Sequence, residues 1–211
     1  HGDGTNGSTT ITDSSPTPKT VTASGNAQIS TAQSKFGGAS LLFDGNSDWL
    51  STPHSADFSF GAGDFTIEFW ARTTQTNAAS FVAHRSGAGA ANTNWLIQIG
   101  SASSGKVSLY LSDGTTYQVN ALSTTTSVNT GDWFHIAVVR SGSNIALYVD
   151  GISEATATWA GAISSTSREL RVGDDNSTNF YNGYIDDLRI TKGVARYTSN
   201  FTRPTAPFPD I

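Results

Sequence analysis

Short runs in which apolar and polar residues alternate recur along this chain, and clusters of Gly, Asp, Asn and Ser separate them. Alternation at every second residue, with many β-branched and aromatic side chains, is typical of strands that bury one face. No segment shows a sustained helical period with capping residues. The pattern therefore predicts an antiparallel all-β fold, with strands within residues 40–45, 65–72, 95–100, 106–121, 133–140, 145–159, 169–173 and 184–190.

Two Asp-Gly pairs lie between strand-like arms, at Asp113-Gly114 and Asp150-Gly151. Asp and Gly tolerate the positive φ angles of a type I′ turn. Each pair therefore predicts a β-hairpin.

The period of two also assigns faces to the strands. The residues of the run 65–72 divide into Phe65, Ile67, Phe69 and Ala71 on one face and Thr66, Glu68 and Trp70 on the other. Apolar residues occur on both faces of some strands, which indicates that the second face is either partly covered or lines a groove. The sequence leaves both alternatives open.

Two adjacent aspartates interrupt the last strand-like run, "YIDDLRI" at 184–190. Strict alternation places Asp186 on the face of Leu188 and Ile190, just beyond the edge of the core. A carboxylate in that position needs a partner, and Ca²⁺ is a suitable one because it takes about six to eight oxygen ligands. The alternative is that Asp186 accepts backbone N–H hydrogen bonds at a strand edge, while Asp187 pairs with Arg189.

Composition and charge narrow the range of partners. The 211 residues carry a formal net charge of −5, which argues against nucleic acid because phosphate binding needs clustered Lys and Arg. The apolar runs are far shorter than the ~20 residues of a membrane span. Only 14 % of the residues are charged, and the chain has no cysteine. Low charge with clear apolar patterning favours an extracellular or virion protein.

Length and proline content predict the domain organisation. Residues 1–203 are expected to form a single domain, because a sandwich or barrel of this size is commonly one unit. The closing stretch "RPTAPFPDI" is rich in proline. Residues 204–211 are therefore expected to form an extended strap or linker.

Three stretches, "GDFTIEFWAR", "GDWFHIAVVRSGSNIALYVDG" and "FYNGYIDDLRITKGVARYTSNF", follow one another in this order. Together they resemble the laminin G-like branch of the concanavalin A-like lectin/glucanase superfamily. The closing "TKGVARYTSNFTRPTAPFP" is also similar to modules of phage structural and tail proteins. The resemblance implies a two-sheet antiparallel β-sandwich, or jelly roll, of the kind that binds carbohydrate or protein.

The resemblance also implies a structural calcium ion as cofactor, shared by the start of the chain, an early strand and the last strand. The matching positions are Asp186, a residue near Asp3, and Asp44 with Gly45. Asp13, in "TITDSS", is a further candidate ligand.

One candidate carbohydrate-binding segment is the acidic, amide-rich stretch 173–183. Its side chains with oxygen or aromatic groups are Asp174, Asp175, Asn176, Asn179 and Tyr181. The polar members can ligate calcium or sugar hydroxyls, and the tyrosine ring can stack on a sugar. The alternatives are an ordinary solvated loop and a tyrosine that covers the core.

A second candidate surrounds Trp95, whose ring can stack on a sugar while Asn92 and Asn94 reach its hydroxyls. Arg85 is expected on a neighbouring loop and can join them. Trp159 is a further possible platform. For each tryptophan the alternative is packing under a loop.

Catalysis is not expected. The glucanases of this superfamily carry two carboxylates along one strand as E-x-D-x-x-E or a close variant. The three glutamates here, Glu68, Glu154 and Glu169, have no Asp two residues on. Adjacent aspartates 186 and 187 cannot replace them, because neighbouring strand residues point to opposite faces.

Three functions are therefore compared. The first is a lectin-like module that attaches a phage or secreted protein to glycans on a cell surface. The second is a structural or adhesion module whose partner is another protein, such as a neighbouring virion protein. The third is a glycoside hydrolase or lyase. The first is favoured.

Overall fold

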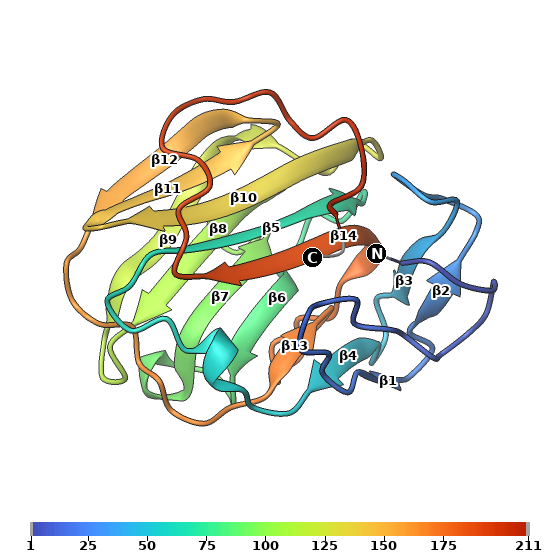
Figure 1. The fold of residues 1–211 in the computed structure, drawn as a ribbon, viewed down its shortest axis with the longest axis horizontal. Helices are drawn as coiled ribbons and strands as arrows, with labels where there is room; N and C mark the ends of the chain where they lie inside the picture. The colour runs from blue at the N-terminus through green and yellow to red at the C-terminus, as the bar shows by residue number, and fades with distance from the viewer. Residues whose placement is uncertain (1, 210–211) are drawn as a thin grey trace.

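A computed structural model describes residues 2–209 as a sandwich of two antiparallel sheets, each with seven strands (Figure 1). In spatial order, sheet A contains β1 (Thr22–Ser24), β4 (Trp49–Thr52), β13 (Leu170–Val172), β6 (Ala79–Arg85), β7 (Thr93–Ile99), β8 (Lys106–Ser112) and β9 (Tyr117–Ser127). Sheet B contains β12 (Ile152–Thr158), β11 (Asn144–Val149), β10 (Trp133–Ser141), β5 (Phe65–Arg72), β14 (Asn182–Lys192), β3 (Ser40–Asp44) and β2 (Gln28–Ser30). The predicted all-β sandwich is confirmed.

Helical structure is confined to two short 3-10 turns, η1 (Ala56–Phe58) and η2 (Ala90–Asn92), within the described residues. Neither turn approaches the length or the apolar character needed to cross a membrane, and the same holds for any helix in the described part.

The core lies between the sheets, and alternation predicts its members correctly. In β5, Phe65, Ile67 and Phe69 are completely buried between the sheets. The opposite face of β5, with Glu68 and Trp70, is buried as well. Of the two sequence alternatives for this second face, coverage by another part of the chain is therefore the one observed.

The cover is the C-terminal segment 193–209, hereafter the C-terminal strap. It leaves the end of β14, passes along β10, β11 and β12, and returns to β14 (Figure 1). Tyr197 and Phe201 stack on each other and pack against Tyr148 of β11. Phe208 is 8 % exposed, and the Arg189 guanidinium lies 3.8 Å from the centre of its ring. Residues 204–209 therefore lie on the domain as a strap; residues 210–211 are outside the described part.

Both predicted hairpins are present. Asp150 and Gly151 form a two-residue connection between β11 and β12 with φ angles of 50° and 82°, as a type I′ turn requires. The other hairpin has a longer connection, in which the Asp113 N–H donates to the Thr116 carbonyl at 3.2 Å. Residues 113–116 therefore join β8 to β9.

The paired aspartates mark a β-bulge in β14, which corrects the face assignment made from strict alternation. Asp186 pairs with Trp70, and Arg189 pairs with Glu68. Between these two pairs, β14 therefore has one more residue than β5. Asp187 takes up the extra residue at φ 53°, a conformation that Asp tolerates better than most residues. Asp186 consequently shares its face with Arg189, and not with Leu188.

Candidate functional site

A polar pocket of about 330 Å³ opens at one end of the sandwich. It lies between the turn after β3, the connection 73–78 from β5 to β6, and the start of β14. Its lining consists of uncharged residues, namely Gly45, Thr74, Gln75, Thr76, Asn77 and Asn182. Amide and hydroxyl side chains both donate and accept hydrogen bonds. The pocket, hereafter the rim pocket, therefore suits a neutral ligand with many hydroxyl groups.

Gln75 fixes the shape of the rim pocket. Its Nε2 donates to the Phe180 carbonyl at 3.0 Å, and its Oε1 accepts the Asn182 N–H at 2.8 Å. Thr73 adds a hydrogen bond from its hydroxyl to the Asn182 carbonyl at 2.6 Å. The connection 73–78 is thus tied to the start of β14 on both sides of the pocket.

Two exposed amides remain available. Within the described part of the chain, the side chains of Asn77 and Asn182 are exposed and make no hydrogen bond. Both line the rim pocket. They are the pocket's strongest candidates for direct contact with a ligand.

An aromatic pair includes Phe180, whose carbonyl accepts the hydrogen bond from Gln75 of the rim pocket. Trp49 of β4 and Phe180 are stacked with ring centres 6.4 Å apart, and both are half-buried. The Arg171 guanidinium lies 4.9 Å from the centre of the Trp49 ring. Arg171 itself is held by Glu169 and Asp174, each at 2.5 Å. Its positive charge is therefore matched by two carboxylates.

The loop 173–183 reaches this rim, but several of its predicted ligands point into the protein. Asp175 has no exposed surface and accepts hydrogen bonds from Arg85 at 3.0 Å, Gln98 at 2.8 Å and Asn179 at 2.9 Å. Asp175 thus anchors the loop to β6 and β7, and Arg85 is its buried partner. Asn176 and Asn179 remain half-buried.

Tyr181 and Asp174 require the same correction. Tyr181 has no exposed surface, and its hydroxyl donates to the Arg72 carbonyl at 3.1 Å. Burial raises the pKa of this phenol well above its usual value. Asp174 is 1 % exposed and binds Arg171. Neither side chain is available to a sugar, because Tyr181 is packed in the core and Asp174 is engaged in an ion pair with Arg171.

The predicted cluster around Trp95 is not a surface either. Trp95 has no exposed area, and its Nε1 donates to the Phe58 carbonyl at 2.9 Å. Asn94 is also fully buried and donates to the Thr166 carbonyl at 2.8 Å. Asn92 is exposed, with its amide donating to the Ala88 carbonyl at 2.9 Å. The alternative of packing under a loop is therefore the one observed for Trp95.

Trp159 is half-buried and lies away from the other predicted residues. The Arg140 guanidinium sits 5.5 Å from the centre of its ring. Arg140 also donates to the Trp159 carbonyl at 3.2 Å. Trp159 is not among the residues that line the rim pocket.

Asp186 has the surroundings of an anion site. Its carboxylate accepts backbone N–H groups from Gly2 at 3.3 Å, Lys35 at 2.9 Å and Phe36 at 3.2 Å. The alternative of backbone hydrogen bonding is therefore confirmed for Asp186. Burial raises the pKa of this carboxyl, although the three N–H groups act against the rise. Backbone N–H groups face both carboxylate oxygens of Asp186. This arrangement does not fit a calcium site, because the positively polarised hydrogens would repel a cation.

The other predicted calcium ligands do not gather around Asp186. Asp3 lies against Gly37, while Asp13 accepts the Lys19 N–H at 2.7 Å in a separate loop. Asp44 pairs with Asn182 at the C-terminal end of β3, and Gly45 follows it. Asp186 lies near the other end of β3, where its neighbour Ile185 pairs with Leu41. No group of three or more His, Cys, Asp or Glu side chains suited to a metal occurs among residues 2–209. The calcium ion stays a prediction without a defined set of ligands.

Asn77, Asn182 and Phe180 are not among the sugar-binding residues predicted from the sequence. The polar run "TTQTN" at 73–77, directly after a strongly apolar strand, is the signal that could have found the connection 73–78. Nothing in the sequence places this run beside Asn182, because the two are brought together by the pairing of β5 with β14.

Comparison with known sequences gives a family match. The family profile described as "Concanavalin A-like lectin/glucanases superfamily" matches residues 44–196, which is more than half of the chain. No curated protein sequence matches the chain.

Solved structures with the same fold include several binding domains. Domain 4 of AbnA, a GH43 extracellular arabinanase from Geobacillus stearothermophilus in complex with arabinotriose, has a TM-score of 0.61 at 17 % identity and covers 84 % of each chain. The binding domain of botulinum neurotoxin DC in complex with SialylT has a TM-score of 0.60 at 16 % identity, over 87 % of this chain and 45 % of that one. The binding domain of Paraclostridial Mosquitocidal Protein 1 has a TM-score of 0.62 at 16 % identity, over 85 % and 45 %. The chain thus spans under half the length of these toxin binding domains, and the likeness is one of fold.

Proposed function

Because the chain belongs to the concanavalin A-like lectin/glucanase superfamily, in its laminin G-like branch, we propose that it is a non-catalytic carbohydrate-binding module. The observation that carries the proposal is the rim pocket, whose lining is uncharged and whose Asn77 and Asn182 amides are exposed. Sugar hydroxyls are bound by groups of this kind, because amide and hydroxyl side chains both donate and accept hydrogen bonds. Domain 4 of AbnA and the binding domain of botulinum neurotoxin DC, which share this fold, were solved in complex with arabinotriose and SialylT, and this supports a carbohydrate ligand.

The charges around the rim pocket favour neutral glycans. Arg171 is engaged by two carboxylates and offers no free charge to an acidic sugar. The Asn26 side chain donates to Asp44 at 3.0 Å and lowers the pKa of that carboxyl, which therefore stays ionised beside Gly45. A fixed negative charge and the lack of an unmatched cation disfavour uronic acids and sialic acids.

The arrangement of the glutamates supports a non-catalytic function. Glu68 is fully buried under the C-terminal strap and binds Arg189 and Tyr197. Glu154 binds the Thr126 hydroxyl at 2.7 Å, and Glu169 binds Arg171. Each glutamate thus has a structural partner, whereas glycoside hydrolysis needs a pair of carboxylates that flank the scissile bond.

Binding to purified glycans tests the proposal. We expect saturable binding of one or more neutral oligosaccharides in isothermal titration calorimetry, and at least tenfold weaker binding by the double variant Asn77→Ala/Asn182→Ala. Asn92→Ala, which removes an exposed amide from a different loop, is the matched control and should bind as the wild type. Absence of binding across a broad glycan panel, or release of products from a polysaccharide, would contradict the proposal.

The setting of the module also stays a prediction. We infer an extracellular or virion location from the low charge and from the similarity of the closing segment to phage modules. A glycan on a cell surface is then the expected partner, and a neighbouring virion protein is the alternative.

A further inference from the structure

Among residues 2–209, sheet B lacks a neighbouring strand along one part of β14. β3 pairs with β14 only as far as Ile185, opposite Leu41. β14 continues to Lys192 and pairs there with β5 alone. In an antiparallel strand, alternate residues direct their N–H and C=O groups to opposite sides. Within the described residues, one edge of β14 from Leu188 to Lys192 therefore has no strand beside it.

A cavity of about 510 Å³ lies next to this edge. Its apolar walls come from the inner faces of both sheets, namely Leu41, Leu50, Leu170, Val172, Leu188 and Ile190. Leu188 and Ile190 are only half-buried, although inner-face residues of the adjacent strand β5, such as Ile67, are completely buried. The gap in the sheet thus leaves part of the core face of β14 uncovered.

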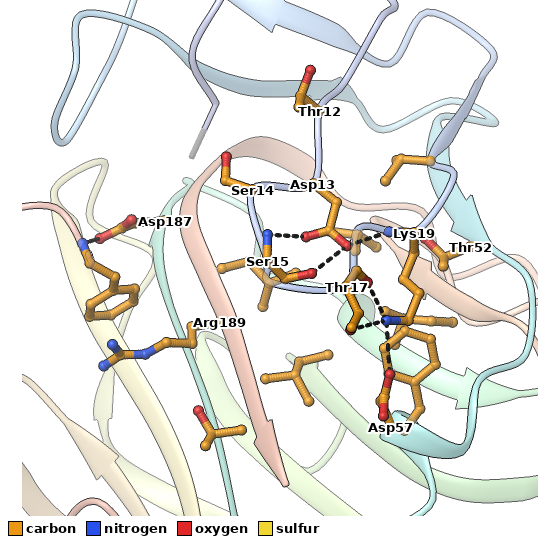
Figure 2. A pocket seen from close by; sticks show the side chains of 18 of the residues that line it. Thr12, Asp13, Ser14, Ser15, Thr17, Lys19, Thr52, Asp57, Asp187 and Arg189 are labelled. Atoms are coloured by element: carbon orange, nitrogen blue, oxygen red, sulfur yellow. Dashed lines mark hydrogen bonds and ion pairs between the residues drawn. The ribbon is translucent and has the colours of Figure 1, made fainter. Parts of the chain in front are cut away.

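The chain's own N-terminal segment passes over the cavity without filling the gap (Figure 2). Residues 11–19 form no strand. Asp13 accepts hydrogen bonds from the Ser15 N–H at 3.0 Å and the Lys19 N–H at 2.7 Å. Lys19 in turn binds Asp57 at 2.8 Å. Figure 2 shows these contacts beside the cavity, and none of them engages the edge of β14.

The lining of the cavity includes four cationic side chains, Lys19, Arg189, Lys192 and Arg196, and three carboxylates, Asp13, Asp57 and Asp187. Glu68 is shared by Arg189 at 2.7 Å and Arg196 at 3.8 Å. Asp57 is paired with Lys19, and the Lys192 ammonium donates instead to the neutral Ala56 carbonyl at 2.8 Å. The end of β14 near Lys192 therefore suits an acidic group.

We propose that this gap binds an extended peptide, which adds to sheet B as a strand along residues 188–192 of β14. Main-chain hydrogen bonds to the open edge supply affinity in this mode, and pockets for alternate side chains supply specificity. The partner is a peptide segment with apolar side chains at every second position, which enter the cavity, and with an acidic residue beside Lys192. A small apolar molecule would fill the cavity but would leave the N–H and C=O groups of the strand edge without partners. The site shares no lining residue with the rim pocket, so the proposal does not rest on glycan binding.

The first experiment tests the main-chain pairing with the wild-type chain. The probe is an eight-residue peptide that begins with two aspartates and then alternates valine and threonine, so that in antiparallel pairing its acidic end lies beside Lys192. We expect it to bind in calorimetry and to slow the hydrogen exchange of amides in residues 188–192. A second peptide with the same side chains, but with N-methyl groups on alternate residues, should bind at least tenfold more weakly, because it cannot donate along one edge.

The second experiment tests the cavity and the charge. Ile190→Trp, which fills the cavity, should weaken the peptide at least tenfold, while Ile152→Trp at a 51 % exposed position should not. Lys192→Glu should weaken the aspartate peptide and favour one that begins with two lysines. The proposal would be overturned if the N-methylated peptide bound as tightly as the unmodified one, or if no peptide bound at millimolar concentration. It would also be overturned if the cavity bound benzene but did not bind the peptide. The peptide results with the wild type decide the question even if Ile190→Trp does not fold.

Discussion

Asp187 accepts a hydrogen bond from the backbone N–H of Phe208 at 2.9 Å, so a carboxylate in the bulge of β14 holds the end of the C-terminal strap. Its neighbour Asp186 receives the Gly2 N–H at 3.3 Å. Two adjacent side chains thus hold segments from opposite ends of the sequence.

The first prediction concerns pH. Burial raises the pKa of Asp187 to about 6, above the value of an unfolded aspartate. The native state therefore takes up a proton at a higher pH than the unfolded state does, and this residue adds stability as the pH falls from about 7 towards 4. Asp187→Asn tolerates the same backbone angle and cannot titrate. The wild type should gain stability relative to this variant over that interval, as measured by urea unfolding at a series of pH values.

The comparison with Asp187→Asn is needed because His84 acts in the opposite direction. Burial lowers the pKa of His84 to about 4, so the unfolded state binds the proton first, and stability falls between about pH 6.5 and 4. Both chains contain His84, and its effect cancels in the difference. A constant difference between wild type and variant from pH 7 to 4 would contradict the assignment to Asp187.

The second prediction concerns Asp186. Asp186→Ala removes the acceptor of three backbone N–H groups and should lower the free energy of unfolding by about 3 kcal/mol, because buried donors are left unsatisfied. Asp186→Asn keeps the size and one acceptor and should cost less. Chemical denaturation measures both, and an Asp186→Ala variant as stable as the wild type would contradict the buried amide cluster.

The third prediction concerns metal removal. Because the Asp186 carboxylate already receives N–H donors on both oxygens, we expect any effect of EDTA on the melting temperature to be the same in the wild type and in Asp186→Ala. A calcium ion bound by the native state alone would stabilise it by mass action. A fall in melting temperature with EDTA that Ca²⁺ reverses, and that Asp186→Ala abolishes, would instead support the calcium prediction made from family resemblance.

The fourth prediction concerns Trp95. Because Trp95 is completely buried and its indole N–H binds Phe58, Trp95→Ala should destabilise the fold by about 3–5 kcal/mol. Its affinity for glycans, measured on the fraction that remains folded, should match that of the wild type. A stable variant with selectively lost glycan binding would mean that the ring is exposed to ligand.

The fifth prediction concerns the anchor of loop 173–183. Asp175→Ala leaves the Arg85 guanidinium, which is 5 % exposed, without its carboxylate. Loss of one partner of a buried pair typically costs about 3–5 kcal/mol, and the loosened loop should weaken glycan binding at the adjacent rim. The exposed Asp132→Ala is the matched control and should change neither quantity.

The sandwich could be predicted from the sequence because alternation and turn residues are local signals. The Asp150-Gly151 turn and the inner face of β5 follow from them directly. Strict alternation does not predict the bulge at Asp187; its mark is the three-residue step between the core-facing Ile185 and Leu188, which a single extra residue produces.

The site was harder to predict because burial depends on tertiary packing. Trp95, Asn94 and Asp175 belong to residue types that bind sugars when exposed, and the sequence does not show that all three lie inside. Asn77 and Asn182 lie in ordinary polar stretches, and only the pairing of distant strands brings them to one pocket. Family resemblance supplied the correct superfamily but not the ligands.

The neighbouring anchors of residues 2 and 208 have an engineering consequence. A few added residues can connect the two ends, and the polypeptide can then be opened at an exposed connection such as 102–104. The resulting circular permutant would retain every strand of both sheets. For the same reason, the module can be inserted as a cassette into a surface loop of a host protein, with both joints on one side.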